Sequence, residues 1–176
     1  MSNKNPLIYV WLGSVIPKWS IKSLNFTCKL NKKRKILLLY DTKKSINIIR
    51  NIKSKNFESI FIKNINKSSP ILNSSNLFEG DFWKLTSQRF QILLDFLNKE
   101  KILNFFHAEL DNLIFNFDDL DNKLDNIGSG IFVPKDSFNR AIASFLYCNR
   151  TECLNEIIDI YKPPNNVRND MEALGI

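Results

Sequence analysis

The sequence predicts an α/β fold in which a mainly parallel β-sheet is flanked by helices, as in Rossmann-like proteins. Short apolar runs at residues 7–12, 35–41 and 59–63 have the length and composition of buried strands. Two amphipathic stretches, residues 20–31 and 45–56, lie between these runs and have helical spacing. This alternating order implies right-handed crossovers and parallel pairing, so we expect ligands to bind beyond the carboxyl ends of the strands.

The first strand and helix are marked by the residues that flank them. The run "LIYVWL" is bounded by Gly13 and Pro17, which predict a loop after the strand. Ser20 is a candidate N-cap for the first helix. The second strand, "KILLLYD", ends at the carboxylate of Asp41.

The second half of the chain begins with a polar, turn-rich stretch at residues 64–78, which predicts an exposed loop. A long helix is expected at residues 80–101, and the residues on its core face are Phe90, Leu93, Leu94 and Leu97. The remaining expected elements are a fourth strand within 104–116, an acidic turn or short helix at 117–126, strands within 128–134 and 141–149, and a helix at 151–161 capped by Thr151.

Length and composition limit the class of protein. The chain has 176 residues, of which 44% are hydrophobic, so we expect a single domain over residues 1–176. No apolar stretch approaches the roughly 20 residues of a membrane helix, and the amino terminus does not resemble a signal peptide. A cytoplasmic location is therefore expected. The three cysteines include no CxxC pair and are expected to be free thiols.

Charge is distributed unevenly along the chain. The formal net charge is +7; residues 1–67 carry 15 Lys and Arg against 2 Asp and Glu, or +13, which leaves −6 for residues 68–176. Such asymmetry fits a surface for nucleic acid, anionic lipid or a phosphate-bearing ligand. An ordinary solvated face, in a chain that is rich in lysine throughout, is the favoured interpretation, and an anion-binding surface stays open as the alternative.

The stretch "NFFHAELDNLIFN", residues 104–116, carries the most distinctive chemistry. It places His107, Glu109 and Asp111 two residues apart, and all three would share one face if the strand continued through them. Carboxylates at the end of a strand suit Mg²⁺ or Mn²⁺, which take their remaining ligands from water and substrate phosphates. The sequence lacks the GxGxxG, GxxxxGK[ST] and GxSxG motifs.

Four segments carry a resemblance to a known family: "YVWLGSVIPKW", "ILLLYD", "FWKLTSQRFQILLDFL" and "ILNFFHAELDNLIF". The chain resembles nucleotide-sugar glycosyltransferases of the GT-A fold over about residues 7–160. Their DxD element would read here as Glu109-Leu110-Asp111, preceded by His107 in an HxExD form. The resemblance implies transfer of a sugar from a nucleoside-diphosphate sugar, with a UDP-sugar favoured, to a hydroxyl of a glycan or other acceptor, as in surface-polysaccharide synthesis. More sequence normally follows in this family, so the chain is expected to be a short or incomplete member.

The resemblance assigns a role to each matching position. Asp111 would bind Mn²⁺ or Mg²⁺, and Glu109 would bind the ribose or reach the metal through water. Arg89 would approach the nucleotide or fix a carboxylate, and Asp41 would accept a hydrogen bond from the uracil or ribose. Gly13 would allow the chain to turn so that the backbone of Leu12 faces the base.

Each assignment has a plain alternative. Both carboxylates can face solvent in a turn, Asp41 can cap a helix, and Arg89 can form a surface ion pair with Asp81 or Asp95. His107 can be a third site group, or a core residue that hydrogen-bonds a neighbouring backbone. The three tryptophans fit the core or a pocket rim, where one could stack on a sugar.

Two other functions compete with the transferase interpretation. One is a domain of the same fold without catalytic activity. The other, less favoured, is a nucleic-acid-binding module that uses the basic stretch "NKKRK" at residues 31–35.

Overall fold

The computed structural model describes residues 4–62, 82–124, 126–162, 167 and 169–175. The strands are β1 (Lys4–Trp11), β2 (Arg34–Tyr40), β3 (Phe57–Phe61), β4 (Phe105–Ala108), β5 (Ile131–Phe132), β6 (Lys135–Ser137), β7 (Arg140–Ala141) and β8 (Phe145–Cys148). The helices are α1 (Ser20–Leu30), the 3-10 helix η1 (Lys43–Ser45), α2 (Ile46–Ile49), α3 (Phe82–Glu100), α4 (Asp118–Leu124), α5 (Cys153–Ile160) and α6 (Asp170–Ala173).

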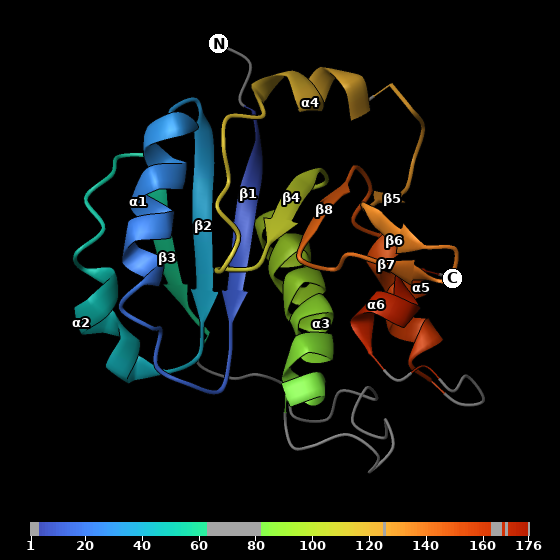
Figure 1. Cartoon of the computed structure of the whole chain (residues 1–176), viewed down its shortest axis with the longest axis horizontal. Helices are drawn as coiled ribbons and strands as arrows, with labels where there is room; N and C mark the ends of the chain where they lie inside the picture. Colours follow the sequence, from blue (N-terminus) through green and yellow to red (C-terminus); the bar gives the residue numbers. More distant parts are fainter. Residues whose placement is uncertain (1–3, 63–81, 125, 163–166, 168, 176) are drawn as a thin grey trace.

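The centre of the molecule is a six-stranded sheet with the order β3-β2-β1-β4-β8-β5 (Figure 1). The pairs β1–β2, β2–β3 and β1–β4 are parallel, whereas β8 is antiparallel to both β4 and β5. Strands β6 and β7 form a separate antiparallel pair. The predicted α/β fold with a mainly parallel, helix-flanked sheet is therefore confirmed.

The sheet has a hydrophobic core on each face, because alternate residues of a strand point to opposite sides. Leu7 and Tyr9 of β1 pack in a cluster with residues of α1 and α2. Ile8, between them in sequence, packs in a second cluster with residues of α3 and α5. The predicted core face of α3 is confirmed, since all four of its residues are buried; they are Phe90, Leu93, Leu94 and Leu97.

Helix ends were the least accurate part of the prediction. Ser20 is the first residue of α1 and not its N-cap, because its hydroxyl donates to the carbonyl of Pro17 at 2.8 Å. Thr151 does not cap α5 either, since it donates to the carbonyls of Ile102 and Leu103. The helix expected at residues 45–56 is much shorter. The predicted loop at residues 64–78 lies outside the described residues.

The short length of α2 has a local cause. The side-chain amide of Asn51 donates to the carbonyls of Asn47 and Ile48, at 3.1 and 3.0 Å. Both carbonyls are among the last of the helix; that of Ile48 also accepts from the backbone N–H of Asn51, whereas that of Asn47 would otherwise need a partner from a further turn. The side chain of Asn51 thus allows the helix to end after Ile49.

The cysteines are free, as predicted, and their burial gives a test of the fold. Cys28 on α1 and Cys148 on β8 are buried, and burial raises the pKa of Cys28 to about 11 and that of Cys148 to about 12. Cys153 is partly exposed. Because the thiolate is the reactive form, we expect Cys153 to react first with a thiol reagent in the native protein. The substitution Cys153→Ser should remove the fast phase of the reaction. A fast phase that persisted in this variant would contradict the burial of Cys28 and Cys148.

No helix in the described part of the chain is long and apolar enough to cross a membrane.

Candidate functional site

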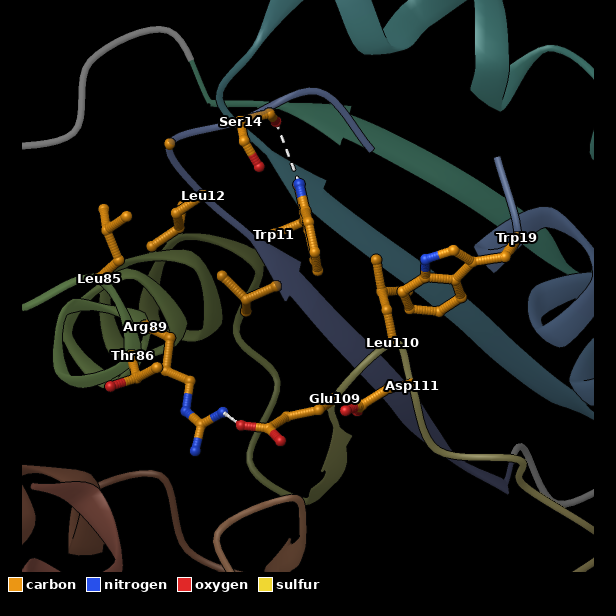
Figure 2. A pocket seen from close by; sticks show the side chains of 12 residues that line it. Trp11, Leu12, Ser14, Trp19, Leu85, Thr86, Arg89, Glu109, Leu110 and Asp111 are labelled. Atoms are coloured by element: carbon orange, nitrogen blue, oxygen red, sulfur yellow. Dashed lines mark hydrogen bonds and ion pairs between the residues drawn. The ribbon is translucent and has the colours of Figure 1, made fainter. Parts of the chain in front are cut away.

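A pocket of about 390 Å³ lies beyond the carboxyl ends of β1 and β4, where α/β sheets bind ligands (Figure 2). It is lined by the end of β1 and the loop that follows, by Trp19 just before α1, by α3 and by the loop after β4. Five of the six predicted site residues are among them: Leu12, Gly13, Arg89, Glu109 and Asp111. The structure therefore gathers positions that are up to about a hundred residues apart in the sequence.

The sixth predicted residue, Asp41, supports the pocket from the next strand. Its carboxylate oxygens accept from the backbone N–H of Gly13 at 2.9 and 3.1 Å. Gly13 has a φ of +77°, a conformation that side chains rarely adopt, and a Cβ there would lie 2.6 Å from a methyl group of Leu85. The tight turn expected at Gly13 is confirmed, and Asp41 fixes the loop that forms one wall of the pocket.

Arg89 is the centre of a buried ion-pair network. Only 4% of its surface is exposed. Its guanidinium pairs with the carboxylate of Glu109, donates to Asp170 at 2.6 Å and donates to the carbonyl of Ala143 at 3.0 Å. Figure 2 shows the side chain pointing from α3 toward Glu109. Arg89 thus fixes a carboxylate of the pocket, and the alternative of a surface pair with Asp95 is wrong.

The strand that carries the motif ends earlier than a continuous alternation would require. Strand β4 stops at Ala108, so His107, Glu109 and Asp111 do not line one strand face. The backbone N–H of Glu109 donates to the carbonyl of Ser144 at 2.9 Å. The backbone N–H of Asn112 donates to the backbone carbonyl of Glu109 at 3.1 Å and closes a turn. This turn directs Glu109 toward Arg89 and leaves Asp111 exposed.

His107 is a core residue, as one of the two interpretations held. It is fully buried and does not line the pocket, and its Nδ1 lies 2.9 Å from the carbonyl oxygen of Ile8. Burial, and next the positive charge of Arg89, lower the pKa of His107 to about 3. The imidazole is therefore neutral near pH 7.

Asp111 is the exposed carboxylate of the pocket. Within the described ranges its side chain has no hydrogen bond or ion pair, whereas the side chain of Glu109 is 34% exposed and paired with Arg89. Among the described residues no group of three His, Cys, Asp or Glu could hold a metal by itself. A site completed by substrate phosphates needs only one or two carboxylates. Asp111 fits that donor set, and Glu109 fits it less well because Arg89 already neutralises it.

Two tryptophans contribute to the walls of the pocket. Trp11 comes from the end of β1, and its indole N–H donates to the carbonyl of Ser14 at 3.1 Å. Trp19 precedes α1 and is 50% exposed. Both are therefore rim residues, consistent with the rim interpretation. The side chain of Trp83 lies outside the described part of the structure.

Sequence reasoning missed Asp170, which is 3% exposed and holds Arg89 from α6. A local signal was present, because Asn169 caps α6 by accepting from the N–H of Glu172 at 3.0 Å. An Asn followed three residues later by Glu is typical of a helix start. That signal predicts a helix, but it gives no indication that the helix packs beside Arg89.

No protein-family model and no curated protein matches the sequence. Solved structures do match the fold. The chain is similar to the PaToxG glycosyltransferase, with a TM-score of 0.60, 13% identity, and coverage of 97% of this chain and 66% of that one. It is also similar to a transferase solved as a double cysteine-to-serine mutant, with a TM-score of 0.54, 15% identity, and coverage of 99% and 84%.

A third similar structure is a cytidylyltransferase from Leptospira borgpetersenii serovar Hardjo-bovis. Its TM-score is 0.52 at 13% identity, with coverage of 91% of this chain and 65% of that one. The chain thus spans just under two thirds of the length of the glycosyltransferase and of the cytidylyltransferase. The likeness shows that the chain has a transferase-like fold.

Proposed function

We propose that the protein is a metal-dependent glycosyltransferase of the GT-A type that moves a sugar from a nucleoside-diphosphate sugar, with a UDP-sugar favoured, to a hydroxyl of a glycan acceptor. The observation that carries the proposal is the exposed carboxylate of Asp111, which has no partner among the described residues, in a pocket beyond the carboxyl ends of β1 and β4. The transferase-like fold supports it, because ligands of such sheets bind at this edge.

The charges around the pocket support a divalent cation. Among the residues that line the pocket, Arg89 contributes one formal positive charge and Glu109 and Asp111 contribute two negative charges, so this group has a net charge of −1. A diphosphate is itself an anion and would be repelled by such a group. Mn²⁺ or Mg²⁺ between Asp111 and the diphosphate would remove that repulsion.

The other residues of the pocket have roles that follow from their contacts. The loop at Leu12 and Gly13, held by Asp41, offers backbone groups to a base. Trp11 and Trp19 offer flat aromatic surfaces on which a base or a sugar can stack. Arg89 holds the carboxylate of Glu109 in place, where it can accept from a ribose hydroxyl.

The chemistry would be substitution at the sugar carbon that is bonded to the diphosphate. A divalent ion at Asp111 would neutralise the charge on the leaving nucleoside diphosphate. The protein would contribute by holding the donor in line with the acceptor hydroxyl and by limiting access of water to the pocket.

The proposal predicts that Mn²⁺ together with a UDP-sugar stabilises the folded protein. A ligand at about a hundred times its dissociation constant adds about 2.7 kcal/mol. For a chain of this size that corresponds to a rise of roughly 5–10 °C in melting temperature. The rise should require both components, and Asp111→Asn should abolish it because the substitution removes the proposed metal ligand.

Asp119→Asn is the matched control, because Asp119 is an exposed carboxylate on α4 outside the pocket. It should leave the ligand-induced rise unchanged. A rise that survived in Asp111→Asn would contradict the metal assignment. Release of UDP in the presence of Mn²⁺ then separates a catalytic domain from one that only binds the donor.

A further inference from the structure

The outer surface of α1 and of the loop beside it carries aromatic, aliphatic and basic side chains side by side. On α1 these are Lys22, Phe26 and Lys29, whose spacings of four and three residues place them on one face. Trp19 continues the same face toward the pocket, three residues before Lys22. We call this surface, together with Leu113 and Phe115, the α1 ridge.

Leu113 and Phe115 belong to the segment that follows the motif. Exposure alternates along it, so that Asn112 and Ile114 are half-buried, whereas Leu113 and Phe115 are 53% and 62% exposed. The Phe115 ring meets that of Phe26 edge to face, with centroids 5.3 Å apart. Two apolar side chains are thus held outward next to the basic face of α1.

Hydrogen bonds hold this segment against α1 near the start and at the end of the helix. Ser23 donates to the carbonyl of Asn112 at 3.0 Å near the start of the helix. At the end of the helix, the side-chain amide of Asn31 donates to the carbonyl of Phe115 at 3.2 Å, and that of Asn116 donates to the carbonyl of Leu30 at 3.0 Å. Figure 1 shows the segment between β4 and α4 running beside α1.

The α1 side of the ridge is positively charged, whereas the segment with Leu113 and Phe115 is flanked in sequence by the exposed carboxylates of Asp111 and Asp119. The first acidic residue of the chain is Asp41, so residues 1–40 contain no carboxylate side chain. Lys18, Lys22, Lys29, Lys32 and Lys33 are all exposed in this region. Exposed apolar side chains among cations are the combination by which proteins bind the surface of an anionic bilayer.

We propose that the α1 ridge docks the protein on an anionic lipid membrane. Leu113, Phe115 and Phe26 would enter the boundary between headgroups and acyl chains, while the lysines contact the phosphates. A nucleic acid fits less well, because single strands bind in basic grooves lined with aromatic rings, whereas this surface exposes the aliphatic side chain of Leu113.

The position of the ridge relative to the pocket has a consequence for the acceptor. Trp19 lines the pocket and Asp111 stands two residues before Leu113, so the ridge and the pocket meet. A membrane bound to the ridge would bring the mouth of the pocket to the lipid surface. Docking itself does not depend on the proposed transferase activity.

Binding to lipid vesicles tests this proposal without metal or nucleotide, so its result is independent of the proposed activity. We expect the protein to sediment with vesicles that contain phosphatidylglycerol and not with phosphatidylcholine alone. Lys22→Gln with Lys29→Gln should lower the partition coefficient about 20- to 30-fold, since each lysine near an anionic surface contributes about fivefold. Leu113→Ser with Phe115→Ser should lower it about tenfold.

The matched control is Lys44→Gln with Lys53→Gln, which removes the same charge from exposed positions outside the ridge. It should retain most of the binding, and thermal melts check that every variant folds. Equal loss in the control, or no binding of the parent protein to anionic vesicles, would overturn the proposal. Tighter binding to single-stranded RNA through the same residues would overturn it in favour of a nucleic-acid partner.

Discussion

Replacing Arg34 with methionine is expected to lower the free energy of unfolding by about 3–5 kcal/mol, which is the usual effect of removing one partner of a buried ion pair. Arg34, at the start of β2, is fully buried, and the side chain of Asp121 on α4 is only 5% exposed. The guanidinium pairs with both oxygens of Asp121 and lies over the ring of Phe117, 4.0 Å from its centroid. Methionine has a similar length and leaves the carboxylate buried without its main partner.

The neighbouring Lys35 provides a matched control. It pairs with Glu58 at 2.7 Å, but both side chains are more than half exposed. Exposed pairs contribute about 1 kcal/mol or less, so Lys35→Met should have little effect on denaturant unfolding. The double change Arg34→Met with Asp121→Leu should recover much of the loss, because it removes the unpaired buried charge. If Arg34→Met and Lys35→Met lowered the free energy of unfolding by similar amounts, burial would not explain the contribution of the Arg34–Asp121 pair to stability.

The order of strands and helices was predictable because it depends on local patterns. The three apolar runs correspond to β1, β2 and β3, and the helical spacing of apolar residues in α3 correctly placed Phe90 in the core. The end of β4 was not predictable in the same way. Apolar residues continue past Ala108 in the sequence, but the backbone turns between Glu109 and Asn112, where the side-chain amide of Asn112 donates to the carbonyl of Ser144, a partner 32 residues away. A contact of that kind leaves no trace in the local pattern.

The candidate site was predicted residue by residue, but its connections were not. Gly13 and Asp41 were both chosen from their positions after strands, yet nothing in the sequence indicated that the carboxylate binds the Gly13 N–H. Ser20 and Thr151 show the converse. Both have the residue type of a cap, but a nearby carbonyl in the folded chain competes for each hydroxyl. Residue type therefore suggested candidates, and tertiary packing determined their partners.

Arg89→Met is expected to have two separable effects. It leaves Asp170, which is 3% exposed, as a buried unpaired carboxylate, so the free energy of unfolding should fall by about 3–5 kcal/mol. It also frees Glu109, whose carboxylate then has no described partner to hold it in the pocket wall. Binding of a UDP-sugar with Mn²⁺, measured by calorimetry well below the melting temperature, should weaken by tenfold or more. Arg150→Met, which removes an exposed arginine from a weak 3.6 Å pair, is the control for both measurements.

The double variant Arg89→Met with Asp170→Leu separates the two effects. It removes the buried carboxylate together with its partner, so most of the lost stability should return. Glu109 remains unpaired in this variant, so binding should stay weak although the protein is stable. Recovery of stability without recovery of binding would identify Arg89 as a positioning residue that acts through Glu109. If binding returned along with stability, the orientation of Glu109 would have no part in holding the nucleotide, and Arg89 would serve only to join α3 to α6.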